Sequence, residues 1–397
     1  MFTKMREDGV LINNVIMFIA LLSLFLSLKF VFFLFFILIL SLVNTSQIVM
    51  MIKSMLPFLC VILLLIFYSL SGDSIGNQLP FPFLESRDII ISVLIVSSLC
   101  SMKESVVSRK SIIRSLISIS VFISFGKLLI LIYCFKNGIN PSTIVHAISD
   151  ATGWQLMTYD VDESLLSRIQ FPIDLVTCFL VYFQVKFLIE VRSKINLAIL
   201  FLLLFSVLIT MSRAFWFISV VMLFTALLTS KNKKEKKKYI FIIIAFSVLI
   251  YGLFYQSVNS IVMSRVNNSQ NTASDFTRAL QNRNLSNSFL EKPILGHGIG
   301  YFIPSYIRGE GLNRYSYESQ LLSLFMKLGI IGFISIITSL LYIVYYNRRL
   351  CLTNTKNKES IRVVFISLWL FSGAVNPLLF AVPGGIILFL LTCIDEV

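Results

Sequence analysis

The sequence has little charge and almost no histidine. Only 14% of its 397 residues are charged and only two are histidine, whereas soluble domains have about 25% charged residues. The low charge argues against a soluble protein. His146 and His297 lie far apart in the chain, which argues against a metal site. None of the six cysteines forms a CxxC pair, so neither a disulfide framework nor a zinc site is expected.

Hydrophobic residues, in contrast, make up 57% of the chain. They recur in runs of roughly 17–25 residues, each long enough to span a bilayer. We therefore expect an all-α polytopic membrane helix bundle with about twelve transmembrane helices, in which residues 1–397 form a single integral membrane domain. The expected spans lie near residues 11–28, 30–50, 54–71, 89–102, 115–135, 170–189, 196–211, 214–230, 239–258, 318–346, 363–376 and 378–394.

Positive charge predicts how these spans are oriented. The formal net charge is +14, and the segments richest in lysine, such as 103–114 and 231–238, fall on one side of the predicted bundle. The positive-inside rule makes that side cytoplasmic and places both termini there. The same rule accounts for the net charge without any binding of nucleic acid. The longest polar stretch, 259–316, becomes a large outward loop between spans 9 and 10.

Arginine in this outward loop departs from the rule. Because a guanidinium can donate two parallel hydrogen bonds to phosphate oxygens, an arginine cluster favours an anionic ligand at the outer membrane surface, such as a lipid-linked pyrophosphate. The alternative is pairing with lipid headgroups or with acids of the loop. The arginines are Arg265, Arg278, Arg283, Arg308 and Arg314.

The loop is also expected to hold a short helix. Ser274 and Asp275 are typical helix-capping residues, and Pro293 is a stop signal, so a helix is predicted from Ser274 to about Leu290. Arg278 would then point in one fixed direction.

Two residues at the ends of predicted spans have more than one interpretation. Arg213 follows the seventh span in a tight turn; it either extends to the membrane interface or has a function at membrane depth. Glu318 begins the tenth span. It is either a capping acid at the helix N-terminus or a general base.

Charges within the predicted spans carry less information. Lys127, Asp174, Lys186 and Lys327 are candidates to line a polar cavity. The sequence GHGIG at 296–300 lacks the strand and helix of a nucleotide-binding loop, so it predicts a tight turn.

Three short motifs lie in the second half of the chain: SRAFW at 212–216, Arg278 followed by PILGHGIGYF at 293–302, and Glu318-Ser319-x9-Gly329-x-x-Gly332. Together they resemble the O-antigen ligase and O-antigen polymerase superfamily of bacterial inner-membrane glycosyltransferases. The corresponding family patterns are Ser-Arg-x-x-Trp, Arg then Pro-x-x-Gly-x-Gly-x-x-x-Phe, and His-Asn/Ser/Gln-x9-Gly-x-x-Gly. The ligases carry their proposed catalytic histidine where this chain has Glu318. Because polymerase members often have Glu-Ser there, the departure favours a polymerase.

The resemblance implies an inverting glycosyltransferase that needs neither a metal nor another cofactor and that acts at the periplasmic face. Its donor would be a glycan on undecaprenyl pyrophosphate, and its acceptor the next lipid-linked repeat unit. Membrane lipids and a chain-length regulator protein are the other expected partners. The implied catalytic residues are Glu318, Arg278 and Arg213, and the implied residues that bind the pyrophosphate or glycan are Arg265, Arg308, Arg314 and Tyr317.

Two alternatives stay open. An O-antigen ligase would use the same donor but transfer the glycan to lipid A-core. A lipid-linked oligosaccharide flippase has a similar size, but it should spread its charges through the bundle. In this chain the charges gather in one loop and at span ends, which favours an enzyme.

Overall fold

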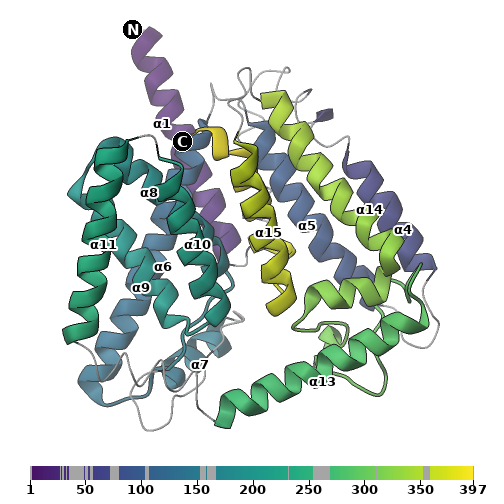
Figure 1. The fold of residues 1–397 in the computed structure, drawn as a ribbon. Coiled ribbons are helices and arrows are strands. Elements are labelled where there is room, and N and C mark those ends of the chain that lie inside the picture. Colours follow the sequence, from purple (N-terminus) through teal and green to yellow (C-terminus); the bar gives the residue numbers. More distant parts are fainter. Residues whose placement is uncertain are drawn as a thin grey trace. The chain divides into compact units, whose positions relative to one another are not determined.

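The structure is a computed structural model. It describes residues 2–26, 57–71, 80–102, 107–152, 167–230, 232–253, 269–309, 311–351 and 358–396, with residues 28, 31–32, 34, 49, 52–53 and 158. Within these residues the elements are helices, and no strand is present (Figure 1). The predicted all-α class is confirmed. The number of transmembrane helices and the large periplasmic loop stay predictions, and most of the expected second span lies outside the described residues.

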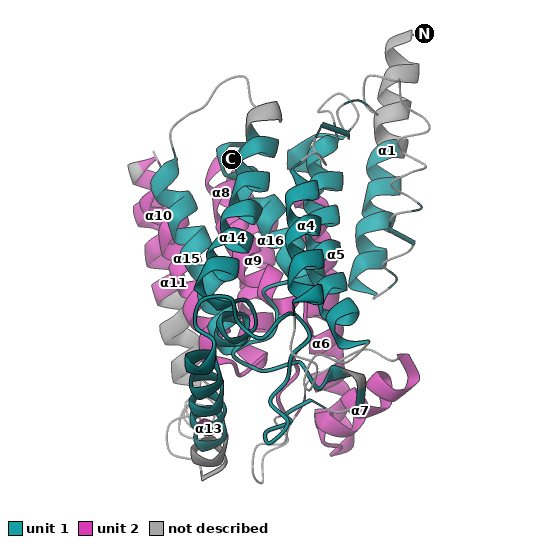
Figure 2. Cartoon of the chain, turned by 90° about the vertical axis from the view of Figure 1, so that its right-hand side faces the viewer, with its two compact units in different colours: residues 1–112, 276–396 teal, residues 113–275, 397 magenta. Residues whose placement is uncertain are grey.

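The chain divides into two compact units (Figure 2). Unit 1 combines Met1–Ile112 with Phe276–Glu396. Within it, α5 packs on α16, and α14 packs on α4 and α5. Its helices are α1 (Phe2–Phe25), α4 (Phe58–Leu70), α5 (Phe81–Ser101), most of α13 (Ser269–Glu291), α14 (Gln320–Cys351), α15 (Glu359–Val375) and α16 (Ala381–Thr392).

Unit 2 comprises Ile113–Asp275 and is organised around α8, against which α9 and α10 pack. Two of the charges predicted to line a polar cavity form a pair here, because Lys127 Nζ lies 2.6 Å from Asp174 Oδ1 and both side chains are buried. The helices are α6 (Arg109–Asn137), which begins in unit 1, α7 (Pro141–Thr152), α8 (Asp174–Val191), α9 (Lys194–Ile209), α10 (Arg213–Leu228) and α11 (Lys233–Leu253).

Several predicted boundaries are wrong, and local propensity explains most of the differences. Helix α5 begins at Phe81, eight residues before the expected span, since a proline such as Pro82 is tolerated in a first helical turn. Most of the lysine run at 231–238 forms the start of α11, because lysine is a good helix former. Helix α7 lies between the spans expected near 115–135 and 170–189, where no span was predicted.

By length and composition, two of the described helical segments are apolar enough to cross a membrane. They are Arg109–Asn137 and Gln320–Arg348. Five shorter apolar helices accompany them. These segments agree with the expected spans near 115–135 and 318–346, and α9 and α10 agree with the spans expected on either side of Arg213.

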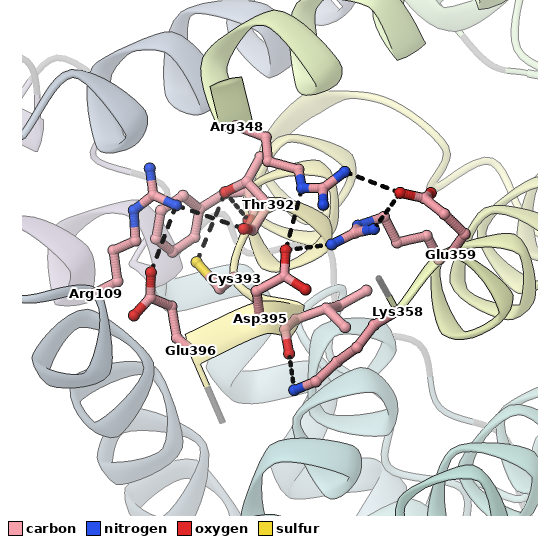
Figure 3. Close-up of polar contacts among 11 residues, drawn as sticks. Arg109, Arg348, Lys358, Glu359, Thr392, Cys393, Asp395 and Glu396 are labelled. Atoms are coloured by element: carbon pink, nitrogen blue, oxygen red, sulfur yellow. Dashed lines mark hydrogen bonds and ion pairs between the residues drawn. The ribbon is translucent and has the colours of Figure 1, made fainter. Parts of the chain in front are cut away.

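A buried network of charges joins the end of α14 to α15 and the C-terminal segment (Figure 3). Arg348 Nε lies 3.1 Å from Asp395 Oδ2, and Arg362 also pairs with this oxygen. Both arginines contact Glu359, at 3.0 and 2.7 Å. Arg109 donates a hydrogen bond to the carbonyl of Thr392. Arg348 and Arg362 are therefore neutralised by Glu359 and Asp395.

We predict that Asp395→Asn destabilises unit 1. Asp395 is 3% exposed and shared by two buried arginines, so its loss should cost about 3–5 kcal/mol. Glu359→Gln is the matched control, because Glu359 contacts the same arginines but is 57% exposed, and exposed pairs contribute only about 0–1 kcal/mol. Thermal unfolding in detergent should show a clear drop for Asp395→Asn only. Equal shifts for the two variants would contradict this account.

Candidate active site

Helix α14 is broken near its start. Gly329 has φ 62° and ψ −173°, a backbone conformation that glycine adopts readily and other residues do not. Such a break leaves backbone groups on both sides without their helical partners. The affected groups include the carbonyls of Met326 and Lys327 before the break and the N–H groups of Ile330 and Ile331 after it.

Residues 293–298, called here the insert loop, supply the missing partners. Two of its N–H groups donate to the carbonyls before the break, and two of its carbonyls accept from the N–H groups after it. The loop therefore completes the hydrogen bonding of the broken helix. The bonds are His297 N to Met326 O (3.1 Å), Gly298 N to Lys327 O (2.8 Å), Ile330 N to Pro293 O (2.9 Å) and Ile331 N to Ile294 O (3.3 Å).

The motif glycines permit this close approach. A Cβ atom on Gly296 would lie 2.4 Å from the carbonyl oxygen of Lys327, and one on Gly329 would lie 2.3 Å from that of Ile294. Gly332 meets the ring of Tyr68, where a Cβ atom would lie 2.3 Å from the nearest carbon. The glycines of two separate sequence motifs thus belong to one interlocked structure, and the predicted turn at GHGIG is part of it.

A buried ion pair joins the segment after the insert loop to the segment that precedes Glu318. The Nζ of Lys327, a residue that is 1% exposed, lies 2.6 Å from Glu85 Oε1 and donates to the carbonyl of Tyr315 at 2.7 Å. The other oxygen of Glu85 accepts a hydrogen bond from Gly300 N at 2.7 Å. One pair therefore holds both the chain after the insert loop and the chain that leads to Glu318.

Glu318 lies between two arginines. Arg278 Nε donates to Glu318 Oε2 at 2.8 Å, and Arg308 Nη2 donates to Oε1 at 2.6 Å. Burial raises the pKa of Glu318, but the hydrogen bonds and charges of the two arginines outweigh it, so the pKa lies below its ordinary value. Glu318 precedes α14 by two residues, and its carboxylate binds side chains. The expectation that it begins the helix is therefore wrong.

Helix α13 supplies Arg278 and runs along the bottom of the view in Figure 1. It begins at Ser269, before the predicted start at Ser274, and ends at Glu291, close to the predicted end. Gln281, one turn after Arg278, accepts a hydrogen bond from Glu318 N at 3.3 Å. The helix thus contacts both the carboxylate and the backbone of Glu318.

Tyr317 has a buried hydroxyl that is used within unit 1. It accepts a hydrogen bond from Ile303 N at 2.9 Å and donates one to the carbonyl of Tyr306 at 3.4 Å. Burial raises the pKa of Tyr317 to about 12, so it is neutral at physiological pH. This arrangement fits a residue that positions Glu318 better than one that contacts a ligand.

Arg213 lies in unit 2, at the first position of α10. It pairs with both carboxylate oxygens of Asp275, at 2.7 and 3.1 Å, and both side chains are about half exposed. In the same motif, Trp216 Nε1 donates to the carbonyls of Val207 and Leu208, each at 3.2 Å. The tryptophan thereby satisfies carbonyl groups near the end of α9.

The structure thus brings three of the predicted residues together, namely Arg278, Arg308 and Glu318. Arg314 is exposed and forms no ion pair with the described residues, and Arg265 lies outside them. Sequence reasoning missed the role of Glu85, which lies between the expected spans near 54–71 and 89–102, and the pairing of Lys327 with it. Within the described part of the chain, no three His, Cys, Asp or Glu side chains group as a metal site requires.

Comparison with known proteins matches part of the chain to a family model. The sequence model of the O-antigen ligase family matches residues 198–337. The match includes Arg213, Arg278, Glu318 and Gly329, and it confirms the resemblance to the O-antigen ligase and polymerase superfamily. Members of this family are membrane glycosyltransferase-like enzymes, in agreement with the apolar helices of the chain. No curated protein and no solved structure gives a significant match.

We predict that Glu85 and Lys327 position the site and do not merely stabilise the fold. Either Glu85→Leu or Lys327→Met alone leaves an unpaired buried charge and should cost about 3–5 kcal/mol, whereas the double variant should restore most of this stability. The double variant still lacks the hydrogen bonds to Gly300 and Tyr315. In the double variant, hydrogen exchange should therefore accelerate in 299–303 and 314–319, while the unfolding temperature stays close to that of the unaltered protein.

The matched control replaces the other buried pair, with Lys127→Met and Asp174→Leu in unit 2. This variant should leave exchange in 299–303 and 314–319 unchanged. The positioning role would be refuted if the Glu85→Leu/Lys327→Met protein kept normal exchange in both segments.

Proposed function

We propose that this protein polymerises lipid-linked oligosaccharide repeat units at the periplasmic face of a bacterial inner membrane. The growing glycan leaves undecaprenyl pyrophosphate and is transferred to the next lipid-linked unit. The observation that carries this proposal is that Arg278 and Arg308 hold Glu318, the residue that the motif resemblance aligns with the histidine of the ligases.

In the proposed reaction, Glu318 takes the proton of an acceptor hydroxyl. The acceptor oxygen then bonds to the anomeric carbon of the donor while the bond from that carbon to the pyrophosphate breaks, which inverts the anomeric centre. Negative charge grows on the departing pyrophosphate. Arg278 and Arg308 stabilise this charge through fixed guanidinium donors. Arg213, Arg265 and Arg314 are proposed as further contacts of the donor.

A second candidate is an O-antigen ligase, which the description of the matched family favours. The two activities leave different products in cells that lack the gene. Loss of a polymerase leaves lipopolysaccharide with a core that carries a single repeat unit and no ladder on a gel. Loss of a ligase leaves a bare core while polymer accumulates on the lipid carrier. A gel of lipopolysaccharide from the deletion strain therefore separates them, and a bare core would refute the polymerase.

We predict that the three residues of the site are each needed for activity. Glu318→Gln removes the base and should lower the rate about 10²–10⁴-fold. Arg278→Ala and Arg308→Ala remove charge stabilisation and should each cost about 10²–10³-fold. Arg283→Ala is the matched control, because Arg283 is exposed on the same helix as Arg278. The measurement is elongation of purified lipid-linked units in proteoliposomes, at equal amounts of inserted protein. Full activity in Glu318→Gln would eliminate it as the base.

We predict a second signature in the pH dependence. A general base is active when ionised, so a lowered pKa lets it work at lower pH. In the free enzyme the pKa of Glu318 lies below its ordinary value, which for glutamate is about 4.3. The profile of kcat/KM, which reports on the free enzyme, should therefore stay flat as the pH falls from 7 to about 5. An acid limb of kcat/KM near pH 6 would point to a different base.

A further inference from the structure

The two arginines of the site are already occupied. Each oxygen of the Glu318 carboxylate accepts a hydrogen bond from one guanidinium, at 2.8 Å from Arg278 Nε and at 2.6 Å from Arg308 Nη2. A pyrophosphate group would need the same donors, since it also binds guanidinium groups through paired oxygens. The base and the leaving group of the proposed reaction therefore compete for one pair of cations.

We propose that the carboxylate of Glu318 occupies the anion site formed by Arg278 and Arg308 at rest, and that a phosphate group of the donor displaces it. The identity of the donor rests on the proposed function. The competition for the arginines does not, because it depends only on the charges and contacts of the resting site.

The exposure of the three side chains makes this exchange feasible. The side chain of Arg278 is 41% exposed, that of Arg308 is 37% exposed and that of Glu318 is 32% exposed. A ligand can therefore reach the guanidinium groups from solvent. Ion pairs with this much exposure are weak, because water and salt screen them. A phosphate group with more than one negative charge can therefore replace a single carboxylate.

The exchange would couple donor binding to activation of the base. At rest the arginines lower the pKa of Glu318 and weaken it as a proton acceptor. Once the donor takes the arginines, the carboxylate loses both partners and lies beside a new anion, and each change raises its pKa. Glu318 thus becomes a stronger base only when a donor is present.

The other groups around Glu318 leave this coupling intact. From α13, Arg278 reaches the carboxylate and Gln281 accepts from the backbone N–H. From the preceding loop, Arg308 is the charged contact. The adjacent Tyr317 has a pKa raised by burial to about 12 and does not change charge near neutral pH. The two arginines therefore control the state of the carboxylate.

The test is the affinity of the purified full-length protein for inorganic pyrophosphate, measured by calorimetry in detergent at fixed ionic strength. Removing a competitor should strengthen binding even though it abolishes catalysis. Glu318→Gln should bind pyrophosphate roughly 3- to 30-fold more tightly than the unaltered protein, a range that corresponds to two weak ion pairs.

Two controls separate competition from a general effect of charge. Glu291→Gln removes one negative charge at the end of the same helix, where Glu291 is exposed, and should change the affinity less than twofold. Glu318→Gln combined with Arg308→Gln should lose the gain, because the effect of Glu318 acts through the arginines.

The outcomes also distinguish this inference from the proposed function. Affinity in Glu318→Gln that is equal to or below that of the unaltered protein would overturn the exchange, and so would an equal gain in Glu291→Gln. Undetectable binding in all the proteins would overturn it as well. The predicted affinity pattern without any polymerisation would leave the exchange standing and contradict only the polymerase.

Discussion

The broken backbone of α14 at Gly329 is the constraint on which the rest of the site depends. Backbone N–H and C=O groups that are buried without partners cost free energy, so a break inside an apolar helix persists only if another segment satisfies them. Residues 293–298 do this with four hydrogen bonds. The insert loop is thereby held against α14. The loop joins α13 to the segment that leads to Glu318, so both of these neighbours are anchored next to the break.

Two kinds of charge pair surround this break and differ in what they can do. Glu85 and Lys327 are buried, and their hydrogen bonds go to each other and to the backbone of Gly300 and Tyr315, which suits a fixed support. Glu318 and its arginines are about one-third exposed, so their contacts can be exchanged for those of a ligand. A buried, fixed pair together with an exposed, exchangeable pair suits a binding site on a stable scaffold.

Sequence reasoning predicted the helical class and the turn at Arg213, because hydrophobic run length and motif spacing are local properties. It also singled out Arg278 and Glu318, which the structure brings into contact. It also noted Lys327 as a charge within a span. It could not pair Lys327 with Glu85, since the two lie far apart in sequence and Glu85 lies outside the expected spans. The break at Gly329 was equally hidden, because the apolar pattern continues through it. Its cause is a set of backbone hydrogen bonds to a distant loop, which leaves no trace in hydrophobicity.

The central claim is that Arg278 and Arg308 form an anion site that Glu318 fills at rest. The most direct measurement is a pair of electron cryomicroscopy structures in lipid nanodiscs, with and without a polyprenyl pyrophosphate. Without the lipid, both guanidinium groups should contact Glu318 beside a break at Gly329. With the lipid, both should contact its phosphates, and the Glu318 carboxylate should be released while the break persists. A bound lipid with Glu318 still between the two arginines, or an unbroken α14, would contradict the account.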